Sequence, residues 1–302
     1  MLRKLDRQLA RIETAARDAR RPYAVVVISD HGQTQGPPFR QRWGQTLADV
    51  VRKASVNGSV EGSVQGDESW GYLAGSLTEA SGGTGWAARV IRTATRSRTT
   101  DGIVELGPNA RRPNGRRTKP PTEPSEIVVM GSGCLGLIYF PKRPGRLTLE
   151  EIEQAYPDLI PTLRAHPGIG FLLIHSSRRG AVVLGRNGTN YLGEGAVEGE
   201  DPLASFGSTA IQHVRRTDGF PHVADIMVNS AYDAQSEEVY AFEELVGSHG
   251  GMGGPQSYPF ILLPSDWAVP EQTIVGAESM HQWMRRWLNN LGQASSEQSA
   301  SH

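Results

Sequence analysis

Residue types that bind divalent metal ions occur in two short segments of the chain. The stretch "VVVISDHGQ", residues 25–33, ends an apolar run with Asp30 and His31, and "GSHGGMGG", residues 247–254, contains His249. Carboxylate oxygens and imidazole nitrogens are ligands that proteins use for zinc. We therefore predict Asp30, His31 and His249 to be metal ligands. For Asp30 and His31 taken by themselves, a turn carboxylate beside a surface histidine is the simpler interpretation.

Glycines flank both histidines. Gly32 follows His31, and Gly250 and Gly251 follow His249. Glycine allows a backbone to approach a ligand closely or to adopt positive φ angles. These three glycines are therefore candidates for loop support around a site. The histidines elsewhere in turns and at the ends of elements are expected to be structural: His166, His175, His213 and His222.

The elements that must position Asp30 and His31 are a helix and a strand. Apolar residues recur at spacings of three and four near the N-terminus, which predicts an amphipathic helix of about 18 residues. Tyr23 to Ile28 is apolar and rich in β-branched residues, which is typical of a buried parallel strand. Helix followed by buried strand indicates an α/β fold, in which ligands gather at the carboxyl ends of the strands. Asp30 and His31 are at such an end.

Gly131, Gly133 and Gly136 match the pattern G-x-G-x-x-G. A dinucleotide site needs a helix that begins at the third glycine, but Leu137 to Phe140 reads as another strand. We therefore expect a β-hairpin here. Thr148 is predicted to cap a helix, because acidic residues follow it in the first turn.

The chain is expected to divide as follows. Residues 1–95 begin the main α/β domain, 96–126 form a flexible, basic, proline-rich loop, 127–200 form a small α+β insert, 201–292 return to the main domain, and 293–302 are a disordered tail.

Charge and composition exclude several functional classes. The 302 residues include 31 Lys+Arg and 32 Asp+Glu, a net charge of −1, so binding to nucleic acid is not expected. Cys134 is the only cysteine, which excludes an internal disulfide and fits a reducing compartment. The first residues contain no apolar signal core, and the sequence contains no apolar run of about 20 residues that could span a bilayer. The chain is expected to be soluble and cytoplasmic.

The segments "VVISDHGQTQG" and "FEELVGSHGGMGGPQSYPFILLP" resemble the Asp-His-Gly and terminal His-Gly motifs of the alkaline phosphatase superfamily, type I phosphodiesterase/nucleotide pyrophosphatase branch. The similarity is closest to actinobacterial proteins in which such a domain follows a membrane-embedded, holin-like region. "HPGIGFLLIHSS", "GEDPLASFG" and "FPHVADIMVNSAYD" extend the resemblance over nearly the whole chain. It implies a partial alkaline-phosphatase-like sheet covered by helices.

The resemblance also implies chemistry. Members of the superfamily hydrolyse phosphate esters with two metal ions, usually zinc, and a Thr or Ser nucleophile. By the family pattern, Asp30 and His31 would bind the ion that activates the nucleophile, and His249 would bind the other ion.

One departure from the family pattern concerns the residues before Asp30. The family order places a metal aspartate, the nucleophile and Asp-x-x-x-His ahead of Asp-His, but the 29 residues before Asp30 contain no such set. The sequence is therefore expected to be the C-terminal part of such a hydrolase, inactive alone. Alternatives are one half of a split enzyme, whose partner is the N-terminal half, or a non-catalytic binding or scaffold protein.

Overall fold

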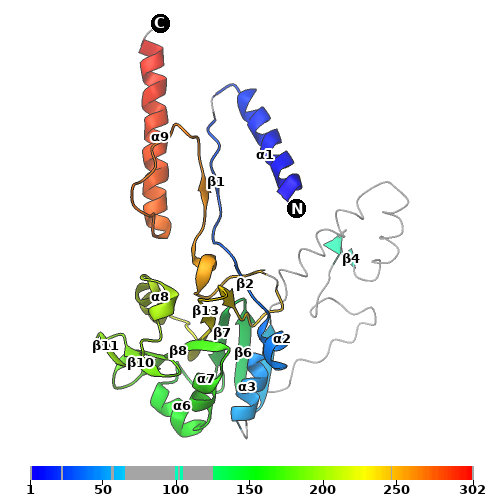
Figure 1. Ribbon diagram of the computed structural model, residues 1–302, viewed down its shortest axis with the longest axis vertical. Helices are drawn as coiled ribbons and strands as arrows, with labels where there is room; N and C mark the ends of the chain where they lie inside the picture. Colours follow the sequence, from blue (N-terminus) through cyan, green and yellow to red (C-terminus); the bar gives the residue numbers. More distant parts are fainter. Residues whose placement is uncertain are drawn as a thin grey trace. The chain divides into compact units, whose positions relative to one another are not determined.

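A computed structural model describes residues 2–21, 23–55, 58–64, 99–100, 103–104, 125–245 and 247–300. The chain forms two compact units (Figure 1). Unit 1 combines residues 1–30 with residues 259–302, and unit 2 comprises residues 31–258.

Unit 2 contains a mixed sheet of eight strands in the order β11-β10-β9-β8-β12-β7-β6-β3. Only the β3–β6 pair is parallel among these neighbours. The mixed content of helices and strands is compatible with the predicted α/β class, although most strand pairs of the sheet are antiparallel. The strands are β3 (Val60–Val64), β6 (Ile127–Ser132), β7 (Leu135–Tyr139), β8 (Ile169–Ser176), β9 (Gly180–Leu184), β10 (Gly188–Tyr191), β11 (Ala196–Gly199) and β12 (Ile226–Ser230).

Helices cover both faces of this sheet because side chains alternate along its strands. On β8, Leu172 and Ile174 belong to a core cluster with α3 (Leu47–Ala54), α6 (Leu149–Ala155) and α7 (Leu159–Ala165). On the opposite face, Phe171 and Leu173 pack with α8 (Ala210–Asp218). The sheet is thus the middle of a three-layer arrangement.

Two local predictions are confirmed in unit 2. β6 and β7 form an antiparallel hairpin at the G-x-G-x-x-G pattern, with the turn at Gly133 and Cys134. The side chain of Thr148 accepts a hydrogen bond from the backbone N–H of Glu151, and the Glu151 carboxylate accepts one from the backbone N–H of Thr148. This reciprocal cap begins α6.

Shorter elements complete unit 2. Two-residue strands form three antiparallel pairs: β2 with β15, β13 with β14, and β4 with β5. The β4–β5 pair falls within the predicted loop 96–126, and most of that loop lies outside the described residues. These elements are α2 (Phe39–Trp43), β2 (Thr34–Gln35), β4 (Thr99–Thr100), β5 (Ile103–Val104), β13 (Tyr232–Asp233), β14 (Glu238–Val239), β15 (Gly247–Ser248) and 3-10 turns at Ala204–Phe206 and Gly254–Ser257.

The described residues of unit 1 form two helices and a short antiparallel ladder. α1 (Leu2–Arg17) confirms the predicted N-terminal helix, β1 (Val27–Ile28) pairs with β16 (Ile261–Leu262), and α9 spans Gly276–Ala300. α9 continues into residues 293–300, which the sequence predicts to be a disordered tail.

The prediction of a buried parallel strand at Tyr23–Ile28 is wrong. Only Val27 and Ile28 form a ladder, it is antiparallel, and Tyr23 and Ile28 are about half exposed, at 53% and 45%. An apolar β-branched run favours extended backbone, but it does not specify which partner strand it meets. The partner here is a two-residue strand far along the chain.

The expected boundary between an insert at 127–200 and the main domain at 201–292 falls inside one sheet. β12 lies between β7 and β8, and pairs with both. The residues of the expected insert supply six of the eight strands. Among the described residues, no helix combines the length and the apolar character needed to cross a membrane.

Glu150 in α6 provides a test of how the helical layer is attached to the sheet. Its carboxylate accepts hydrogen bonds from the Ser176 hydroxyl (2.6 Å) and the Ser177 backbone N–H (2.9 Å) at the end of β8. Partial burial by itself would raise the pKa of Glu150, but these hydrogen bonds outweigh it and lower the pKa to about 2. The ionised form is therefore stabilised by folding.

We expect Glu150→Ala to lower the free energy of unfolding by about 2 kcal/mol at pH 7, because charge-assisted hydrogen bonds are lost. Since the folded pKa is depressed, this contribution is present above pH 4.5 and is lost as the pH falls toward 2. Urea unfolding at pH 7 and pH 3 measures it. Glu153→Ala, an exposed position of the same helix, is the control; an equal loss for both variants would contradict the expectation.

Candidate functional site

The structure brings His31 and His249 into contact. β2 pairs with β15 in antiparallel register, with Thr34 opposite Ser248, so the residues before β2 run beside those after β15. The two imidazole rings stack with their centroids 3.9 Å apart and their planes at 21°. Both side chains are partly buried. Two of the three predicted ligands therefore meet, although they are distant in sequence.

A backbone carbonyl orients the His31 ring. Nδ1 of His31 lies 2.6 Å from the carbonyl oxygen of Gly32. A carbonyl can only accept, so Nδ1 carries the proton and donates it, which leaves the lone pair of the neutral ring on Nε2. A histidine held in this way by its other nitrogen has the orientation that metal-binding histidines usually show.

The β6–β7 turn fixes the backbone of His249. The Cys134 N–H donates to the His249 carbonyl oxygen at 3.0 Å. Gly133 has φ +53°, and a Cβ there would collide with the same carbonyl oxygen. A glycine is therefore needed at position 133 for both its backbone angle and this close approach.

The histidine pair lies where β6 and β12 end. The turn at Gly133 and Cys134 follows β6, and the Cys134 carbonyl accepts from the N–H of Ser230, the last residue of β12. The predicted location after a buried strand at 23–28 is not what the structure shows, because that segment contributes no strand to the eight-stranded sheet.

Glu243 is a buried carboxylate that the sequence analysis missed. It is 6% exposed, and its Oε2 accepts the Gly133 N–H at 2.5 Å. The Phe242 N–H donates to the Gly133 carbonyl at 2.7 Å, so residues 242 and 243 bind both polar groups of this glycine. The signal available in the sequence is an acidic residue placed directly after apolar residues in "VYAFEELVG".

Two buried polar side chains hold the loop that follows His249. The Asn229 amide donates to the Met252 carbonyl (3.0 Å) and accepts from the Met252 N–H (2.8 Å). The Thr34 hydroxyl donates to the Gly253 carbonyl (3.0 Å) and accepts from the Gln256 N–H (2.9 Å). Because both side chains are 1% exposed, these bonds are protected from water.

The three glycines predicted to support the loops lie in contact with backbone or with these buried groups. A Cβ on Gly32 would collide with the Pro255 carbonyl oxygen, and one on Gly251 would lie 2.7 Å from Oδ1 of Asn229. Gly250 has φ +95°. The close packing leaves little space for larger residues.

Cys134 is a packed side chain rather than a reactive one. Its side chain is 0% exposed, and burial raises the pKa of the thiol, which a hydrogen bond with the Ser248 hydroxyl opposes. The thiol is therefore neutral at physiological pH and is a poor nucleophile.

The donor types fit a metal ion, but the described residues do not form a complete centre. His31 and His249 offer imidazole nitrogens, which zinc binds. Asp30 is exposed and is the last residue of the first segment of unit 1. His31 and His249 both belong to unit 2. Nowhere in the part of the chain that the structure describes do three or more His, Cys, Asp or Glu side chains form a group that could hold an ion.

His166, one of the histidines predicted to be structural, is more deeply buried than His31 and His249. His166 is 9% exposed and its ring stacks on Phe39, with the centroids 4.7 Å apart. Burial lowers the pKa of His166, and the positive charges of Arg186 and Lys53 lower it further. These contacts suit the structural role predicted for His166.

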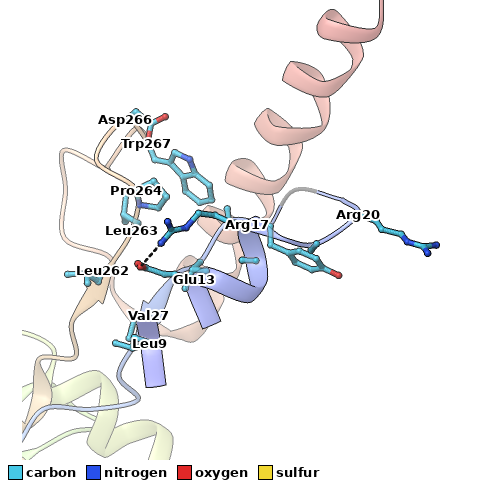
Figure 2. A pocket seen from close by; sticks show the side chains of 15 residues that line it. Leu9, Glu13, Arg17, Arg20, Val27, Leu262, Leu263, Pro264, Asp266 and Trp267 are labelled. Carbon is cyan, nitrogen blue, oxygen red and sulfur yellow. Dashed lines mark ion pairs between the residues drawn. The ribbon is translucent and has the colours of Figure 1, made fainter. Parts of the chain in front are cut away.

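Unit 1 also has a cavity, and no histidine lines it. Its volume is about 940 Å³. Figure 2 shows that its lining residues come from α1 and from the segment around β16. Its charged groups include Glu13 and Arg17, whose side chains form an ion pair at 3.9 Å. Its apolar wall includes Leu9, Leu263 and Trp267. This cavity belongs to unit 1, whereas the histidine pair belongs to unit 2.

Comparisons with known proteins found no match to any family model, to any curated protein or to any solved structure.

We expect Asn229→Ala to lower the free energy of unfolding by about 2–3 kcal/mol, because the N–H and carbonyl of Met252 would lose buried partners. Hydrogen exchange at the Met252 amide is expected to accelerate more than exchange in β8. Urea unfolding and amide exchange measure both effects. Asn187→Ala removes an exposed hydrogen bond to Glu200 and is the control; similar effects from both would show that Asn229 does not hold the loop.

Proposed function

We propose that this chain supplies part of the metal centre of a phosphate ester hydrolase with an alkaline-phosphatase-like fold. The observation that carries the proposal is the contact between His31 and His249 at the strand ends. The two residues come from the two segments that resemble the metal-binding motifs of that superfamily. Within the proposal, each histidine contributes one imidazole ligand, and Asp30 contributes a carboxylate.

The surroundings of the pair support this assignment. The carbonyl of Gly32 sets the proton position on His31, and the turn at Cys134 holds the backbone of His249. Such outer partners keep ligands in one orientation before an ion binds, which strengthens binding. Bound zinc would supply positive charge to stabilise the phosphoryl group of a substrate.

The number of ligands limits what this chain does alone. A zinc ion takes about three protein ligands in a catalytic site, so Asp30, His31 and His249 are too few for two ions. Hydrolysis therefore requires a nucleophile and further ligands from another polypeptide segment. The substrate class in this proposal is a phosphate ester.

A non-catalytic binding or scaffold role is the alternative. Its support is the apolar surface of unit 1, where Ile28, Phe260 and Leu262 are between 45% and 63% exposed. The β1–β16 ladder is only two strands wide, and such a ladder needs additional strands or helices for stability. A partner that covers this surface would suit either function.

We expect the purified chain to bind zinc, and His31→Ala or His249→Ala to weaken binding by about tenfold or more. Isothermal titration calorimetry in a buffer that does not chelate zinc measures this. His281→Ala, an exposed histidine of α9, is the control. Unchanged affinity in both site variants would remove the histidine pair from the proposal.

The same chain with zinc is expected not to hydrolyse p-nitrophenyl phosphate or bis(p-nitrophenyl) phosphate, because the nucleophile and several ligands are lacking. Release of p-nitrophenol, followed by absorbance, tests this. Activity that appears only after a second polypeptide is added would support a shared site. Robust hydrolysis by the chain alone, lost in Asp30→Ala, would contradict the ligand count.

A further inference from the structure

A cavity of 530 Å³ in unit 2 begins at the residues that follow His249. Gly250, Gly251 and Met252 form one end of it, and strands β7 and β12 form its floor. This volume is within the range of small-molecule sites, about 300–1,000 Å³. The floor residues are Leu135, Leu137, Tyr139 and Met227.

The cavity exists because α8 covers only part of its face of the sheet. Ala210 and Val214 of α8 pack in the core cluster that contains Phe171 of β8 and Met227 of β12. Leu137 lies opposite Met227 in the β7–β12 register and points to the same face, but it is only partly buried. Apolar surface of β7 is therefore left open beside the helix.

The polar side chains that line the cavity are either hydrogen-bonded within the protein or exposed to solvent at its opening, which we call its mouth. The Asn229 amide is bonded to both backbone groups of Met252, so it adds no unsatisfied group to the floor. His213 and His222 line the cavity and are exposed. Phe220 also lines it and is 48% exposed, with the Arg216 guanidinium 5.7 Å from the centre of its ring.

An apolar floor with a polar mouth favours a ligand that has an apolar body and a polar end. Gly250, which lines the cavity, directly follows His249 in the chain, although His249 itself is not a lining residue. The proposed function places the phosphoryl group at His249. A phosphate ester bound there would have its alcohol part next to the apolar floor. Sugar or glycerol groups would leave hydroxyls against Leu135 and Leu137 without hydrogen-bond partners, at a cost in affinity.

We propose that this cavity binds the apolar alcohol part of a phosphate ester, an aryl or alkyl group, and so sets the substrate class of the site. This inference rests on the proposed function for the position of the phosphoryl end. The cavity residues are specificity-determining in this proposal.

Calorimetry with two phosphonates, which are not hydrolysed, tests the inference on the full chain loaded with zinc. 1-Naphthylphosphonate is expected to bind about tenfold or more tightly than methylphosphonate, because its ring is buried on the floor. Leu137→Trp places a large ring on the cavity floor where the naphthyl ring would lie, and is expected to abolish the preference. Phe220→Ser at the mouth is expected to reduce it, which keeps the test valid if Leu137→Trp fails to fold.

Ile211→Ser is the matched control, since Ile211 is an exposed residue of α8 that does not line the cavity. It is expected to keep the preference. Equal affinities for the two phosphonates, or a preference unchanged in both Leu137→Trp and Phe220→Ser, would overturn the inference.

A third ligand separates failure of this inference from failure of the proposed function. 1-Naphthol lacks the phosphonate group, so its binding without zinc reports on the cavity alone. Naphthol binding that Leu137→Trp abolishes, in a chain that does not bind zinc, would support the apolar site and reject the metal centre. Zinc binding that depends on His31 and His249, without any preference for the naphthyl group, would reject the apolar site alone.

Discussion

The turn between β6 and β7 is the constraint on which the site depends. Within two residues, it donates N–H groups to Glu243 and His249 and offers carbonyl groups to Phe242 and Ser230. These bonds join the hairpin, the end of β12 and the glycine-rich segment. Because a buried N–H or carbonyl is costly to leave unpaired, the four partners hold one another in place. The position of His249 is therefore a property of the sheet as a whole.

The features that the sequence predicted correctly depend on local physics. The hairpin was predicted because the strand-like run from Leu137 to Phe140 follows the G-x-G-x-x-G pattern. The start of α6 was predicted from Thr148 and the acidic residues after it, which form a cap without distant contacts. The meeting of His31 and His249 was different. Their shared chemistry and the resemblance suggested it, but the ladder that brings them together pairs Thr-Gln with Gly-Ser, a pattern without apolar alternation. No rule of strand propensity predicts such a pair.

The errors and omissions arise from long-range pairing. Tyr23–Ile28 has the composition of a central strand, but only two of its residues pair, and they pair with β16. The roles of Asn229 and Glu243 depend on the backbone groups to which they hydrogen-bond, and those groups belong to residues far away in the sequence. Sequence patterning indicates that a residue is buried more readily than it indicates a buried hydrogen bond. The supporting side chains of a site are consequently harder to predict than its ligands.

The pairing of β2 with β15 also bears on the order in which the molecule folds. Its residues are separated by more than 200 positions, and closing a loop of that length carries an entropic cost before any contact forms. The β8–β9–β10–β11 meander, in contrast, closes over short connections. All eight strands of the sheet are also synthesised before His249. The β2–β15 pair, which brings His31 and His249 together, can therefore form only after every strand of the sheet has been synthesised.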